Sequence, residues 1–211
     1  MPLPPSVLTG TAVVTVDSTV DVHTAETLWT LCGSSFASLQ DKAAARQLLS
    51  RAEFELEVLD PRVTKYIART DSGQIIGLCT LSNDLTTVPW VSPEFYAARY
   101  PAQLARGAVF YCGVAMVHSD EARLTGAFAA MVSTFGRDIA AANGILAADM
   151  CRFNVDVVQL ASAVTGMMKQ AWGAANLVEL DRQIYLAWEP ANHSPGLPEQ
   201  RGAGTVARPL L

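Results

Sequence analysis

The chain has 211 residues and a formal net charge of −5; half of its residues are hydrophobic and 17% are charged. This length suits one domain with a full core, and the composition excludes an intrinsically disordered chain. Because no lysine- or arginine-rich run occurs, we expect no nucleic-acid-binding surface. The sequence also lacks the pattern of a signal peptide and any uninterrupted apolar run of about 18 residues, so we expect a cytoplasmic protein without a membrane span.

The first third of the chain predicts one strand and two helices. Residues 1–10 are proline-punctuated and resemble a loose arm, and the β-branched run 11–16 predicts a strand that continues near 19–22. Thr24 is suited to cap a helix. The apolar face of that helix is Leu28, Leu31, Cys32, Phe36 and Leu39.

A second helix is expected over 41–59 and ends before Pro61. Its residues Glu53, Glu55 and Glu57 either attract an amine or form a solvated face.

A hairpin and a long aromatic connection follow. Strands are expected over Val63–Arg69 and Gln74–Leu81, joined by the turn Thr70-Asp71-Ser72-Gly73. The connection 82–107 is unusually long, and Pro93 begins a short helix within it that Pro101 closes. Two interpretations stay open: an acceptor pocket, or a satellite cluster that covers an open edge of the core. The aromatic residues concerned are Trp90, Phe95, Tyr96 and Tyr100.

The stretch 108–154 contains the strongest pattern in the sequence. Ala108–Val117 predicts a buried strand, and a helix beginning near Glu121 follows. The apolar face of this helix is Leu124, Ala127, Phe128, Met131, Val132, Phe135 and Ile139. Asn143-Gly144 is a left-handed stop. The strand 145–153 should run parallel to the previous one because a helix crosses between them.

The remainder of the chain predicts one more helix and a strand pair. Asn154 caps or precedes a helix that ends at Trp172-Gly173, with Val157, Leu160 and Met168 on its apolar face. Strands are expected over 177–180 and 183–188, and 189–211 resembles a mobile tail. The four cysteines are widely spaced without a CxxC pair, so we expect reduced thiols and no metal site.

The segment Arg123-Leu124-Thr125-Gly126-Ala127-Phe128 follows the buried strand and opens the long helix. It resembles the cofactor loop of the GNAT superfamily of N-acetyltransferases, which has Arg or Gln, two residues, Gly, one residue, then Gly or Ala. Arg123 and Gly126 match; the third position is Phe128, with Ala129 next. The alternative is an ordinary arginine at the start of a surface helix.

The resemblance, together with the element order over 11–188, implies an α+β fold: a mixed, mostly antiparallel sheet with a β-α-β acyl-CoA-binding unit and flanking helices. It implies acetyl-CoA or another acyl-CoA as co-substrate, no metal, and direct attack by an amine of a small molecule or peptide. A homodimer is one option. By resemblance, Ala115, Met116 and Val117 offer backbone to the pantetheine arm. Residues 123–129 hold the pyrophosphate and Asn154 contacts the arm.

Three candidates for the proton transfers follow. In the position of a glutamate base found on the fourth strand of some relatives, this chain has Tyr111, and in the position of the usual tyrosine acid it has Lys169. Asp149 lies in an apolar run and needs a partner if it is buried. Tyr111 is alternatively a core aromatic, and Asp149 part of a structural hydrogen-bond pair. Rival functions are a synthase that joins long acyl chains to an amino acid or lactone, and a catalytically silent acyl-CoA-binding domain.

Overall fold

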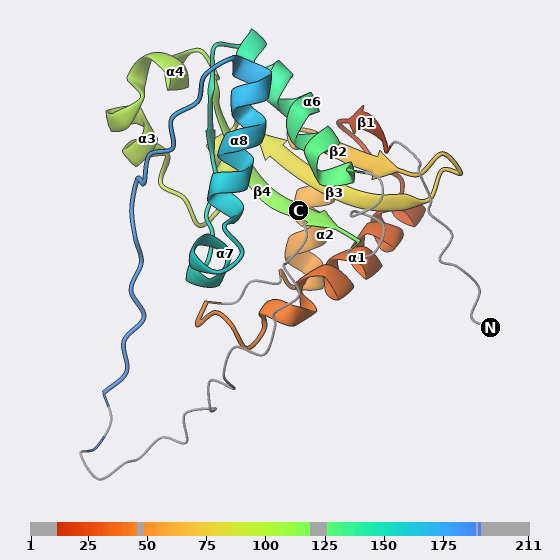
Figure 1. Ribbon diagram of the computed structural model, residues 1–211, viewed down its shortest axis with the longest axis horizontal. Helices are drawn as coiled ribbons and strands as arrows, with labels where there is room; N and C mark the ends of the chain where they lie inside the picture. Colours follow the sequence, from red (N-terminus) through yellow and green to blue (C-terminus); the bar gives the residue numbers. More distant parts are fainter. Residues whose placement is uncertain (1–11, 46–48, 119–125, 189, 191–211) are drawn as a thin grey trace, which may run out of the picture.

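The computed structural model describes residues 12–45, 49–118, 126–188 and 190. These residues form a five-stranded sheet whose spatial order, β1-β2-β3-β4-β5, equals the order in the sequence (Figure 1). The strands are β1 (Val13–Asp17), β2 (Thr64–Arg69), β3 (Ile75–Ser82), β4 (Val109–Val117) and β5 (Ile145–Ala147). Neighbouring strands are antiparallel except β4 and β5, which are parallel. The predicted mixed, mostly antiparallel α+β sheet with flanking helices is therefore confirmed.

Helices cover both faces of this sheet (Figure 1). The longer ones are α1 (Val22–Phe36), α2 (Arg51–Leu59), α6 (Ala127–Ala141) and α8 (Leu160–Trp172). The shorter ones are η1 (Ala37–Leu39), η2 (Leu85–Thr87), α3 (Pro93–Arg99), α4 (Pro101–Ala105) and α7 (Arg152–Asp156). In the described part of the chain, none of them is long and apolar enough to cross a membrane.

The alternation of side chains along the strands divides the core between the two faces. One face carries Tyr66, Cys79 and Leu81, which pack against α6 and α8. The opposite face carries Ile67, Leu78, Val114 and Met116, which pack against α1 and α2. On the same side as α2, Tyr111 and Val109 pack against η2 and α3 of the connection 82–107. The connection therefore extends the helical layer that contains α2.

Two helices begin at residues other than those predicted. The carboxylate of Asp21 accepts a hydrogen bond from the backbone N–H of Thr24 at 2.7 Å, so Asp21 is the N-cap of α1 and no strand continues through 19–22. Residues 41–45 are not helical, and α2 begins only at Arg51. The reason is the capping box of Ser50 and Glu53, which satisfies N–H groups at that point.

The short helix predicted between Pro93 and Pro101 is confirmed as α3, which ends at Arg99 with Tyr100 as its C-cap. Pro101 also begins a further helix, α4, because the first turn of a helix tolerates proline. Two other predictions about secondary structure are wrong in part. Strand β5 ends at Ala147, since Ala148 and Asp149 are exposed and leave the sheet. Asn154 lies inside the short helix α7, so it precedes the predicted helix, α8, but does not cap it; α8 begins only at Leu160, after Gln159.

The strand pair predicted over 177–180 and 183–188 does not form. Its residues have no regular structure, and Leu177, Ile184 and Trp188 are 65%, 72% and 87% exposed. An isolated two-stranded hairpin is marginally stable in water and needs a packed face. Of residues 177–188, only Leu180 packs against a core cluster, so the segment lacks that support.

Candidate functional site

The parallel pairing between β4 and β5 is short. It covers only Val109–Tyr111 against Ile145–Ala147, whereas β4 continues to Val117. Beyond Tyr111, β4 is paired with β3 on one edge, and no described strand pairs with the other edge. Ala115, Met116 and Val117 lie on this stretch. An extended ligand with amide groups can hydrogen-bond to such an edge as an additional strand does.

Helix α6 begins at Gly126, which lies in the left-handed region with a φ of 63°. A side chain added at Gly126 would meet no atom of the described residues within 4 Å, so these residues leave space beside the start of this helix. Ala127 and Phe128 are buried in the core on α6 and Ala129 is exposed. Phe128 therefore faces the core. The candidates Arg123, Leu124 and Thr125 lie outside the described residues.

Strand β4 contains a bulge at Gly113 and Val114. Cys79 of β3 pairs with Ala115 and Leu81 pairs with Cys112, so the single residue between them, Thr80, lies opposite two residues of β4. The hydroxyl of Thr80 accepts a hydrogen bond from the backbone N–H of Val114 at 2.8 Å. A bulge bends the strand and redirects its side chains, and bulges are frequent beside functional sites.

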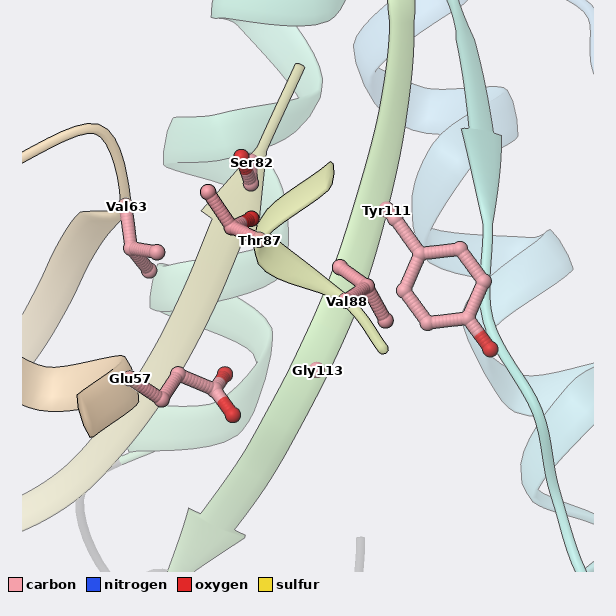
Figure 2. A pocket seen from close by; sticks show the side chains of 7 residues that line it. All are labelled: Glu57, Val63, Ser82, Thr87, Val88, Tyr111 and Gly113. Atoms are coloured by element: carbon pink, nitrogen blue, oxygen red, sulfur yellow. The ribbon is translucent and has the colours of Figure 1, made fainter. Parts of the chain in front are cut away.

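The carboxylate of Glu57 lies against this bulge. The same Thr80 hydroxyl donates a hydrogen bond to Oε1 of Glu57. A Cβ at Gly113 would lie 2.9 Å from Cδ and 3.1 Å from Oε2 of Glu57, and closer still to Oε1. No side chain fits at residue 113 while Glu57 holds this position. Figure 2 shows the Glu57 carboxylate directed toward β4 at Gly113.

A small hollow of about 10 Å³, which is room for about one water molecule, opens at this point, on the face of the sheet that α2 covers. In the view of Figure 2, Glu57 is seen to the left of the β4 ribbon and the Tyr111 ring to its right, with Thr87 and Val88 of the connection between them. The lining residues are Glu57, Val63, Ser82, Thr87, Val88, Tyr111 and Gly113. Gly113 also belongs to the unpaired edge of β4, so the hollow and that edge meet at the bulge.

Tyr111 and Asp149 lie together. The buried Tyr111 hydroxyl donates a hydrogen bond to Oδ1 of Asp149 at 2.6 Å, and the Trp90 indole N–H donates to the same oxygen at 3.3 Å. Burial, followed by the hydrogen bond to Asp149, raises the pKa of Tyr111, so the phenol is neutral and acts as a donor. The structure thus supplies the partner that Asp149 was expected to need, although Asp149 follows β5 and is itself exposed.

Electrostatics distinguish Glu57 from the exposed acids of α2. Burial raises the pKa of Glu57, and the charge of Asp149 adds to that shift, whereas the Thr80 hydrogen bond and the charge of Lys65 oppose it. Lys65 is fully buried, and its Nζ donates to the carbonyl oxygens of Ser18 at 2.8 Å and Asp60 at 2.6 Å. Because Asp60 is the C-cap of α2, Lys65 fixes the end of the helix that carries Glu57.

The aromatic residues of the connection 82–107 divide into two groups. Tyr96 is buried and packs edge-on against Tyr111, with ring centroids 6.5 Å apart, and Tyr100 lies partly buried in the same cluster. Trp90 and Phe95 are 46% and 42% exposed. The satellite-cluster interpretation therefore fits Tyr96 and Tyr100, while Trp90, through Asp149, reaches the surface beside the hollow.

Two candidates lie apart from this group. Lys169 is exposed in the last turn of α8, which packs against α6 on the other face of the sheet. Among the described residues, no hydrogen bond or ion pair joins Lys169 to Tyr111 or Asp149. Asn154 is half-buried in α7. Nor do the described residues include a group of His, Cys, Asp and Glu side chains arranged to hold a metal ion.

Sequence reasoning did not separate Glu57 from Glu53 and Glu55. The sequence does contain a usable signal. Glu57 comes three residues after the buried Phe54 and one before the buried Val58, which places it at the edge of the core-facing side of α2. Nothing in the local sequence shows that Gly113 lies opposite.

Comparison with known proteins adds a similarity to solved structures. No protein-family model and no curated protein sequence matches this chain. Among solved structures, the chain is similar to the aminoglycoside N-acetyltransferase AAC(6′)-Iy in complex with CoA, with 17% sequence identity and a TM-score of 0.44. The match covers 89% of this chain and 100% of that one. A TM-score at this level assigns neither a family nor a substrate.

Proposed function

We propose that this chain is an acyltransferase that moves an acyl group from acyl-CoA to an amine of a small molecule or peptide. The observation that carries the proposal is the unpaired edge of β4 from Cys112 to Val117, which begins at a bulge beside a hollow containing a carboxylate. The pantetheine arm of CoA carries amides that suit such an edge. When bound, acyl-CoA supplies an acyl carbon activated as a thioester.

The chain's own groups can hold the two ends of this co-substrate. The backbone of Ala115, Met116 and Val117 is available to the arm, although the Val117 carbonyl already accepts one hydrogen bond from Ser35 at 3.2 Å. No side chain of the described residues caps the N-terminus of α6, where the helix dipole has its positive end, and the described residues leave space beside Gly126 for a phosphate. We propose Arg123, Leu124 and Thr125 as further phosphate-binding residues.

The acceptor amine is proposed to enter from the side of the connection 82–107. The hollow beside Gly113 is lined on that side by Thr87 and Val88, and the Trp90–Asp149–Tyr111 group lies next to it. We propose acetyl, the simplest choice of acyl group, as the group that is transferred.

Calorimetric titration with CoA and acetyl-CoA tests the proposal. Replacement Gly126→Glu puts bulk and negative charge at the start of α6 and should abolish measurable CoA binding. Replacement Gly73→Glu is the matched control: Gly73 also has a positive φ and open space for a side chain, but it lies in the turn between β2 and β3. Equal CoA affinity of both variants and the parent would refute the proposed cofactor site.

Turnover is measured separately, as release of the free CoA thiol with a panel of amines and peptides. Acylation of any of them supports the enzyme. CoA binding without turnover across the whole panel would instead favour a catalytically silent acyl-CoA-binding domain.

A further inference from the structure

We propose that Glu57, which reaches β4 from α2 at the bulge, is the group that accepts the proton of the acceptor amine. This inference rests on the proposed acyltransferase function and deepens it. The carboxylate lines the hollow, and Gly113 next to it belongs to the unpaired edge of β4. A proton acceptor at this place lies beside the strand along which the thioester is expected to bind.

The position of Glu57 depends on the missing side chain at residue 113. The bulge turns Gly113 toward α2, and the carboxylate fills the space in which a Cβ of that residue would lie. Strand β4 therefore carries no acidic side chain at residue 113, and α2 contributes the carboxylate of Glu57 to the space beside Gly113. Gly113 and Glu57 together do what a single glutamate on β4 would do.

The carboxylate is held in one place, and no cation of the described residues forms an ion pair with it. Among the described residues, its one hydrogen bond comes from Thr80, whose hydroxyl is oriented by the N–H of Val114. The charge of Lys65 acts on Glu57, but the Lys65 ammonium group donates its hydrogen bonds to two backbone carbonyls. One carboxylate oxygen, Oε2, thus has no described donor and is available to an incoming N–H.

The surroundings of Glu57 strengthen it as a base. The titratable groups that interact with it come from several elements: Cys32 of α1, Lys65 of β2, Cys112 of β4 and Asp149 after β5. Burial outweighs the opposing hydrogen bond and Lys65, so the pKa of Glu57 is raised from its usual range. A raised pKa brings a carboxylate closer to the operating pH, where general-base catalysis is most effective.

The proton balance of the step is complete without another reagent. An amine that arrives as R–NH₃⁺ gives one proton to Glu57, and the neutral nitrogen forms the new bond to the acyl carbon. The carbon–sulfur bond breaks, and the second proton lost by nitrogen ends on the departing sulfur as the free thiol. Glu57 then returns its proton to water. The Tyr111 phenol keeps its own proton throughout and donates a hydrogen bond to Asp149.

Replacement Glu57→Gln tests the inference, since it preserves the shape of the side chain and removes the proton acceptor. We expect kcat/KM for the amine to fall by a factor on the order of 10²–10⁴, with CoA affinity unchanged. The acidic limb of the pH profile should disappear in the variant. Glu55→Gln is the matched control on the same helix, because Glu55 pairs with Arg51 at the surface, and its profile should equal that of the parent.

A second variant moves the carboxylate instead of removing it. In the double replacement Glu57→Ala with Gly113→Glu, the strand supplies the acid in the space that Glu57 has left. Turnover should recover by at least roughly tenfold over Glu57→Ala alone. An infrared difference spectrum, parent minus Glu57→Gln, is recorded as a function of pH and does not depend on turnover. It should show a carboxyl group whose pKa is higher than that of an ordinary glutamate.

The outcomes separate this inference from the proposed function. If the parent binds no CoA, the proposed function fails. If the parent and Glu57→Gln bind CoA equally and Glu57→Gln retains full turnover at every pH, the acyltransferase stands and Glu57 is not the proton acceptor. Loss of turnover without loss of the acidic limb would also overturn the inference.

Discussion

The replacement Gly113→Ala puts a single methyl group where the Glu57 carboxylate lies. The new Cβ would be 2.9 Å from Cδ and 3.1 Å from Oε2 of Glu57, so Glu57 has to swing away and lose the hydrogen bond from Thr80. Overpacking in a core costs about 1–3 kcal/mol, and a hydrogen bond to a charged group contributes about 1.5–3 kcal/mol. Because the displaced carboxylate regains hydration, we expect a net loss of about 2–4 kcal/mol in the free energy of unfolding.

Urea denaturation of a double-mutant cycle measures this effect and its cause. In the Glu57→Ala background the obstructing carboxylate is gone, so Gly113→Ala should cost less than about 1 kcal/mol and the coupling energy should be about 1 kcal/mol or more. An equal cost in both backgrounds would show that the bulge excludes a side chain for reasons of its own backbone, and the account given for Gly113 would be wrong.

Gly33→Ala is the control for the substitution itself. Gly33 lies within α1, and a Cβ there meets nothing within 4 Å. Alanine should therefore stabilise the protein by about 0.5–1 kcal/mol, through its better helix propensity alone.

Three further outcomes are expected. Tyr96→Ala should lower the free energy of unfolding by about 3–5 kcal/mol in urea melts, because the buried ring packs on Tyr111; a change confined to the acceptor KM would contradict this. Ser50→Ala should cost about 1 kcal/mol in the same assay by removing the N-cap of α2, and no loss would mean that Glu53 alone holds the cap. The raised pKa of Glu57 favours the protonated folded state, so its stabilising contribution is complete below the ordinary glutamate pKa and is lost as pH rises through the raised value. Melting temperatures of the parent should therefore decline across that window relative to Glu57→Gln, and parallel curves would exclude the shift.

The parts of the fold that could be predicted are those whose signal is local. The turn residues 70–73 identify the hairpin of β2 and β3, and the apolar stripe from Ala127 to Ile139 identifies α6. The parallel relation of β4 and β5 follows from the helix between them. The predicted boundaries of an element are wrong where two local signals compete. At α2, the capping box at Ser50 sets the start of the helix, although helix-forming residues precede it.

The C-terminal strand pair and much of the candidate site depend on distant partners. Residues 177–188 have strand-like composition, but whether they form a hairpin depends on a packed face that the local pattern does not encode. Tyr111 and Asp149 were selected one by one from the sequence, and their hydrogen bond is a product of the fold. The sequence alone does not distinguish Glu57 from the other acids of α2, because its burial depends on the bulge and the glycine of β4.

The order of the strands has a consequence for synthesis of the protein. Since each strand pairs with the one before it, a nascent chain that has emerged as far as Val117 can already form β1 to β4 and cover one face with α1 and α2. The other face, with Tyr66, Cys79 and Leu81, stays uncovered until α6 follows. At translation speeds of about 5–20 residues per second, that apolar surface is exposed for roughly a second or more, long enough for a ribosome-associated chaperone to bind.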